Sequence, residues 1–294
     1  MSDEDAGSQA AASEPSRPPR SPGRNLVAAI ASGVVLAAWI VGTLLWWNWG
    51  FIIFLMACVV VGVFELVRAL GRVGMYASYP PAGIGGSLTI ALSFWLADAW
   101  GQLAGVSALF GGLAMMVIAA LLWRLRGPVS GYIRDAAGSV FTVGYVPLLL
   151  GTLGLLLAQP KGNLRVIVYF VLVVCLDTGA YATGSLIGRH KMAPHISPGK
   201  TWEGFGAGVL LAAVAGAIAT PLMLGGAWWA GFVIGLLVAV AAVTGDLVES
   251  SIKRDAGLKD MGRIIPGHGG ALDRLDSLLV AAPVAWLSML ALVR

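Results

Sequence analysis

The chain has 294 residues, of which 58% are hydrophobic and 12% are charged, with a formal net charge of +4. Soluble domains carry about 25% charged residues, so this composition excludes a soluble globular protein and predicts an all-α, polytopic integral membrane protein. The sequence contains no basic stretch with interleaved aromatic residues that would indicate a nucleic-acid partner.

Residues 1–24 are rich in Ser, Pro, Ala and charged residues. Such a segment cannot bury a core, so we expect a disordered tail. The tail is acidic at its start, and the apolar run behind it is itself long enough to span a bilayer, so a cleaved signal peptide is not expected. The remainder, 25–294, is predicted to form one transmembrane domain.

Apolar runs of about 20 residues, the length that crosses a bilayer as a helix, recur along this domain. They predict about nine transmembrane helices, near residues 25–47, 50–70, 82–99, 102–123, 138–157, 165–187, 204–223, 228–248 and 272–293. Small residues recur within these runs, above all in 204–219, and they predict close packing between helices.

The positions of lysine and arginine predict the orientation of these helices. A cytoplasmic N-terminus places 16 of the 19 basic residues on the cytoplasmic side and leaves only Lys161, Arg165 and Arg294 outside. Tryptophans such as Trp100 and Trp228 then fall at outer ends, where an aromatic belt is expected. The connections near 188–203 and 249–272 are therefore expected to face the cytoplasm, where nucleoside triphosphates are found.

Few acidic residues interrupt the apolar runs, and each is costly to bury in a membrane. Glu65 is followed three residues later by Arg68, and this spacing predicts an ion pair within one helix. Asp177 lies deep in the run 165–187 and is followed by small and hydroxylic residues. These residues predict a cavity around the Asp177 carboxylate.

The connection after this run ends in HISPGKTWEG. The triplet Gly199-Lys200-Thr201 suggests a P-loop, but the first glycine of that motif would stand at position 194, which is Pro194. Although the P-loop is excluded, the stretch still has a basic side chain, Lys200, between the hydroxyls of Ser197 and Thr201. We expect Lys200 to neutralise phosphate charge, while Ser197 and Thr201 donate hydrogen bonds. A basic loop that contacts lipid head groups is the alternative.

A polar segment, SIKRDAGLKDMGRIIPGHGGALDRLD at 251–276, separates the last two apolar runs. Its basic residues can bind phosphates, its glycines allow close backbone approach to an anion, and its aspartates can hold a hard divalent cation. Asp273 and Asp276 lie on one helical face, and Asp246 ends the preceding helix at the same depth. The three carboxylates are expected to converge on one cation; salt bridges to Lys253, Arg254 or Arg274 are the alternative.

The spacing S-x-x-K-R, K-D, P-G-H-G-G and D-R-x-D in this segment resembles the signature of the phosphatidate cytidylyltransferases, the CDP-diacylglycerol synthases. The stretch HISPGKTWEG is similar to the S-P-x-K-T-x-E-G stretch of that family, with Gly199 where lysine is common. The residues after Asp177 are similar to the family's D-x-x-A-Y-x-x-G. The resemblance runs from Asp177 to Asp276, whereas the N-terminal helices share only their apolar character.

The resemblance implies a multi-pass enzyme of the cell membrane, with its active site facing the cytoplasm, that converts CTP and phosphatidate to CDP-diacylglycerol and pyrophosphate. It implies Mg²⁺ on Asp246, Asp273 and Asp276, and a second cation such as K⁺. Membrane lipid is the expected surrounding partner. A homodimer is an assembly that the resemblance allows but does not require. The expected catalytic residues are Asp246, Lys253, His268, Asp273 and Asp276. The expected substrate-binding residues are Asp177, Ser197, Lys200, Thr201, Arg254, Lys259, Asp260, Gly269, Gly270 and Arg274.

Two other functions stay open as alternatives. A CTP-dependent polyprenol or phytol kinase would share the helices, the basic loop and the metal site, but it needs a group that deprotonates an alcohol. An ion-coupled secondary transporter could use Asp177 and Asp246 as ion sites. The sequence opposes the transporter because it has no evident internal repeat and concentrates its phosphate-binding residues in one segment.

Overall fold

The computed structural model describes residues 26–262 and 269–293. The predicted disordered tail at 1–24 and the predicted catalytic residue His268 lie outside the described residues. The helices are α1 (Leu26–Trp46), α2 (Asn48–Arg72), α3 (Tyr79–Trp100), α4 (Gln102–Arg124), α5 (Tyr132–Val143), η1 (Gly144–Leu148), α6 (Leu149–Leu157), α7 (Gly162–Ile187), α8 (Trp202–Ala219), η2 (Thr220–Leu224), α9 (Trp228–Asp255) and α10 (Leu272–Leu292). A short antiparallel hairpin of β1 (Lys191–Ala193) and β2 (Ser197–Thr201) joins α7 to α8.

The all-α, polytopic membrane architecture is confirmed, with the hairpin as a small addition. Within the described part of the chain, eight helical segments are long and apolar enough to cross a membrane. The helix α1 lies at the position of the first predicted span. The total number of spans and the side of the N-terminus remain predictions.

Two local features explain how single spans begin, end and bend. The predicted division of 82–123 into two helices is confirmed, because α3 and α4 meet at Gly101 alone, whose φ of 92° favours glycine. The span Tyr132–Leu157 contains Pro147, which cannot donate a backbone hydrogen bond. The helix widens to a π-helical turn there, as η1, and then continues as α6.

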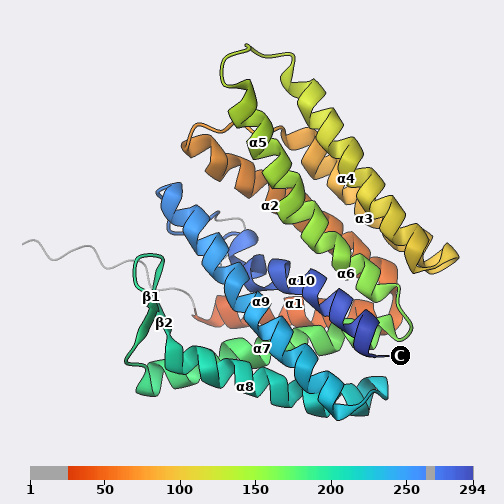
Figure 1. The fold of residues 1–294 in the computed structure, drawn as a ribbon, viewed down its shortest axis with the longest axis vertical. Helices are drawn as coiled ribbons and strands as arrows, with labels where there is room; N and C mark the ends of the chain where they lie inside the picture. Colours follow the sequence, from red (N-terminus) through yellow and green to blue (C-terminus); the bar gives the residue numbers. More distant parts are fainter. Residues whose placement is uncertain (1–25, 263–268, 294) are drawn as a thin grey trace, which may run out of the picture.

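The helices form two groups that meet at α10 (Figure 1). In one group α3 packs against α2 and α4, and in the other α8 packs between α7 and α9. The predicted close packing of 204–219 is confirmed, since the backbone of Gly216 on α8 touches that of Gly231 on α9. Helix α10 contacts both α9 and α6, so it connects the two groups.

Both ends of α10 are held by buried charged side chains from other helices. The carboxylate of Glu65, on α2, accepts hydrogen bonds from the backbone N–H groups of Ala271 (3.1 Å) and Leu272 (2.9 Å). The guanidinium of Arg165, on α7, donates to the carbonyls of Met289 (2.7 Å) and Val293 (2.8 Å). These contacts satisfy polar groups that a helix leaves unpaired at its ends, and each charge has the sign that the helix dipole favours.

Glu65 is therefore a helix cap rather than the intrahelical partner of Arg68. The guanidinium of Arg68 lies over the ring of Phe64, 5.4 Å from its centroid. No ion pair within 4 Å joins Glu65 to Arg68, both of which the structure describes. The sequence spacing was compatible with the pair, but the amides of α10 provide the closer partners.

We expect Glu65→Ala to lower the free energy of unfolding by about 2 kcal/mol, because two amides of α10 would lose a charged acceptor in a buried place. The matched variant Arg68→Ala should cost less than about 1 kcal/mol, since it removes only a contact with an aromatic ring. Thermal unfolding of both proteins in detergent measures the difference. Equal losses would contradict the capping role.

Candidate active site

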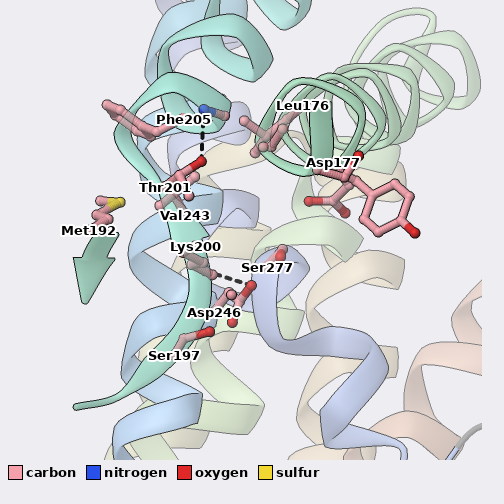
Figure 2. A pocket seen from close by; sticks show the side chains of 16 residues that line it. Leu176, Asp177, Met192, Ser197, Lys200, Thr201, Phe205, Val243, Asp246 and Ser277 are labelled. Atoms are coloured by element: carbon pink, nitrogen blue, oxygen red, sulfur yellow. Dashed lines mark hydrogen bonds and ion pairs between the residues drawn. The ribbon is translucent and has the colours of Figure 1, made fainter. Parts of the chain in front are cut away.

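The β1–β2 hairpin carries the predicted phosphate-binding lysine against the C-terminal half of α9. In the hairpin Lys191 pairs with Thr201, and Ala193 pairs with Ser197. The Nζ atom of Lys200 lies 2.6 Å from the Asp246 Oδ2 atom on α9. This ion pair, drawn as a dashed line in Figure 2, fixes the hairpin against the helix bundle.

A cavity of about 400 Å³ opens between α7, the hairpin, α8 and α9, and Ser277 reaches it from α10. Five predicted site residues line it: Asp177, Ser197, Lys200, Thr201 and Asp246. Figure 2 shows Asp177 entering from α7, across the cavity from the hairpin residues. The remaining wall is largely apolar and includes Leu176, Phe205 and Val243. The cavity therefore has one charged part and one part suited to hydrocarbon.

Thr201 and Glu203 build the local structure of this wall. The hydroxyl oxygen of Thr201 accepts a hydrogen bond from the Gly204 N–H at 3.2 Å and caps α8. This use of the oxygen leaves the hydroxyl hydrogen able to donate. The Glu203 carboxylate lies 2.6 Å from His190 Nδ1 and also accepts the His190 backbone N–H, so it closes the base of the hairpin.

A second group of charges lies where α9, α10 and the intervening segment meet. The Lys253 Nζ atom lies 2.5 Å from Glu249 Oε2 and 2.9 Å from Asp273 Oδ1. The other oxygen of Asp273 accepts the backbone N–H groups of Met261 and Gly270, each at 2.9 Å. Asp273 therefore joins the backbone at Met261 to the backbone at Gly270.

The three predicted metal ligands do not form one cluster in this arrangement. Among the residues that the structure describes, no group of three His, Cys, Asp or Glu side chains is placed to hold an ion. The oxygens of Asp273 are turned to Lys253 and the two amides. Asp276 instead accepts the Ser277 backbone N–H at 2.6 Å, and its charge is near enough to those of Asp246 and Asp177 to be repelled by them. The alternative of salt bridges thus describes Asp273, which pairs with Lys253, whereas Asp246 pairs with Lys200, a partner that the sequence did not indicate.

The other predicted substrate-binding residues lie outside the cavity lining. The guanidinium of Arg254 donates to the carbonyls of Ile196 (3.2 Å) and Leu258 (3.3 Å), so it supports the hairpin tip. Lys259 and Asp260 are exposed after α9, and Arg274 is exposed in the first turn of α10. Gly269 (φ 85°) and Gly270 lie beside the Asp273 carboxylate.

Sequence reasoning gave no role to two buried groups near the carboxylates. Glu249 is 0% exposed, and its spacing of three from Asp246 and four from Lys253 could have placed it on their helical face. The hydroxyl of Tyr145, in η1, is buried without a hydrogen-bond partner among the described residues. It lies close enough to Glu249, Asp276 and Asp246 to interact with their charges. Nothing in the sequence around Tyr145 indicated this position.

Comparison with known proteins extends over almost the whole chain. Residues 27–292 match the sequence model of the cytidylyltransferase family. A phosphatidate cytidylyltransferase of Mycobacterium leprae is 36% identical over 280 residues, which cover 90% of this chain and 87% of the relative. A phosphatidate cytidylyltransferase of Mycobacterium bovis is 36% identical over 278 residues, with 90% and 88% covered. One from Haemophilus influenzae is 42% identical over 148 residues, 47% of this chain and 51% of the relative.

Two glycines of the cavity wall provide a matched pair of variants. A Cβ atom at Gly204 would lie 2.6 Å from the Ala180 carbonyl oxygen on α7, whereas one at Gly199 would meet nothing within 4 Å. We therefore expect Gly204→Ala to push α8 away from α7, with the free-energy cost that is typical of overpacking. Activity should fall at least about tenfold. Gly199→Ala should leave activity unchanged. An equal response of the two variants in a turnover assay would contradict this packing argument.

Proposed function

The chain belongs to the cytidylyltransferase family and is a nucleotidyltransferase, and we propose that its reaction joins CTP and phosphatidate to give CDP-diacylglycerol and pyrophosphate. The names of relatives that match over most of both chains support this choice of substrates. The observation that carries the proposal is the two-part cavity. Its charged part suits phosphates and its apolar wall suits a lipid, as a reaction between a nucleotide and a phospholipid requires.

In the proposed reaction, an oxygen of the lipid phosphate attacks the α-phosphorus of CTP in line. The bond between the α-phosphorus and the oxygen bridging to the β-phosphate breaks, and pyrophosphate leaves with the bonding electrons. A phosphate monoester is already ionised near pH 7. The nucleophile therefore needs no general base, and the chain has to supply positioning and positive charge.

Lys200 is the described basic residue best placed to bind the phosphates, because it lines the cavity. In the proposed complex its ammonium group exchanges Asp246 for phosphate oxygens. Lys253 would neutralise departing pyrophosphate in the same way after leaving Asp273. Arg254 and Lys259 lie farther out, where they would contribute by supporting the hairpin and by long-range attraction of the nucleotide.

Carboxylate oxygens are the ligands that Mg²⁺ prefers, and the like charges of Asp246 and Asp276 lie close enough in this site to repel one another. We propose that these two residues hold Mg²⁺, joined by Asp273 when Lys253 turns to the substrate. A bound Mg²⁺ would offset charge on the attacking and leaving oxygens. Asp177, across the cavity, would supply a further oxygen ligand for a second cation such as K⁺.

The proposed site lies at the cytoplasmic face of the cell membrane. This placement follows from the predicted excess of basic residues on the side that carries the hairpin and the ends of α9 and α10. It gives the cavity direct access to CTP, while the exposed Tyr181 and Leu186 near the hairpin would face membrane lipid. Phosphatidate could then enter without leaving the bilayer.

The position of the transferred phosphorus tests the proposed reaction. With α-³²P-labelled CTP, we expect purified protein and phosphatidate to give labelled lipid. With γ-³²P-labelled CTP, we expect labelled pyrophosphate and unlabelled lipid. A lipid kinase would instead place the γ-phosphorus in the lipid, and a transporter would label no lipid. Lipid that carries label from γ-labelled CTP alone would sink the cytidylyltransferase assignment.

The role of Asp273 can be tested separately. We expect Asp273→Asn to lower turnover roughly a hundredfold or more and to raise the Mg²⁺ concentration needed for half-maximal rate. Asp255→Asn is the matched control, because Asp255 is exposed at the end of α9 and makes no contact with the cavity. If Asp273 serves only as the partner of Lys253, the Mg²⁺ dependence of Asp273→Asn will equal that of the unaltered protein.

A further inference from the structure

A second polar cavity lies in the group of helices that does not carry the hairpin. It has a volume of about 520 Å³ and is lined by the α2–α3 connection, the end of α4, the α4–α5 connection and the start of α5. In Figure 1 the α4–α5 connection is at the top of the view and the hairpin at its lower left. The two cavities share no lining residue.

The wall of this cavity is fixed by a buried carboxylate. Asp135, 3% exposed, accepts the Arg124 Nε–H at 2.8 Å and the Tyr76 backbone N–H at 2.8 Å. The remaining donors of Arg124 bind the carbonyls of Pro128 (2.8 Å) and Ser130 (3.0 Å). Together these side-chain donors of Arg124 hold the α4–α5 connection against α5. The shape of the cavity is therefore fixed by buried hydrogen bonds.

Two further guanidinium groups line the cavity with donors to spare. Arg126 lies over the ring of Trp123, 4.4 Å from its centroid, which holds the guanidinium plane but leaves its edge open. The side chain of Arg134 is 55% exposed, and among the described residues its ion pair is a 4.0 Å contact with Asp135. With Asp135 already shared by Arg124, the cavity carries excess positive charge. A planar guanidinium pair suits a phosphate group.

An apolar hollow adjoins this basic cavity and shares Gly127 and Arg134 with it. Its lining includes Val129 and Ile133, whose side chains are 89% and 83% exposed. Both hollows lie at the ends of the spans Gln102–Arg124 and Tyr132–Leu157, hence at the membrane surface. Apolar side chains exposed at that level favour contact with acyl chains.

From the joined basic and apolar hollows, we propose that the α4–α5 connection binds an anionic phospholipid of the surrounding membrane at a site separate from the catalytic cavity. The phosphate lies between Arg126 and Arg134, and the acyl chains lie over Val129 and Ile133. An isolated phosphate would use only the basic part, and a neutral lipid would leave the excess charge unmatched. The occupant is therefore an amphiphile with a negative head group.

Native mass spectrometry of the purified full-length protein in a neutral detergent tests this site with phosphatidylglycerol and, as the neutral lipid, phosphatidylcholine. We expect Arg126→Gln and Arg134→Gln each to weaken phosphatidylglycerol binding about tenfold, the effect of one charge-assisted contact. Ile133→Ser should weaken it as well. Arg72→Gln removes the same charge at the end of α2, outside the lining, and should change nothing.

Unaltered turnover in zwitterionic micelles verifies that these variants fold, since none lines the catalytic cavity. Inorganic phosphate at millimolar concentration should not displace the lipid. Equal weakening by Arg72→Gln would overturn the proposal in favour of general attraction to basic residues. Displacement by phosphate, or unchanged binding in both arginine variants, would overturn it too.

Discussion

The fixing of α10 at both ends is the constraint on which the rest of the site depends. A carboxylate from α2 holds its N-terminus and a guanidinium from α7 holds its C-terminus, each paired with backbone groups that hydrocarbon could not satisfy. Asp273, Asp276 and Ser277 lie in the first two turns of this helix. Because α10 cannot shift without unpairing a buried charge, these side chains keep a defined depth against α9.

Two lysine–aspartate pairs connect the elements of the site. Lys200 with Asp246 joins the hairpin to α9, and Lys253 with Asp273 joins α9 to the first turn of α10. In each pair the cation and the carboxylate offset one another's cost of burial. Under the proposed reaction the same groups turn to phosphates and Mg²⁺. Binding of substrate would then exchange one set of charge pairs for another, with little change in the number of unpaired charges.

The N-terminal half of the chain is part of this site, although the sequence motifs lie entirely in the C-terminal half. Its helix α2 provides Glu65, which holds the first turn of α10, and η1 provides the buried Tyr145 hydroxyl beside the carboxylates. The family match over residues 27–292 agrees with this distribution. Glu65 and Tyr145 are single polar residues within apolar helices. They form no local sequence motif, and therefore the sequence around them does not indicate their place in the site.

The sequence by itself determined the membrane-spanning helices, the family and the group of residues gathered around the cavity, because these depend on composition, on the length of apolar runs and on local spacing. Asp177, Ser197, Lys200, Thr201 and Asp246 do line one cavity. Only the tertiary structure decided which charges pair. Helical spacing placed Asp273 beside Asp276 and Glu65 beside Arg68, yet Asp273 turns to Lys253 and Glu65 to the amides of α10. The strongest partner of a buried charge is the one that packing brings nearest, and that partner can lie far away in the chain.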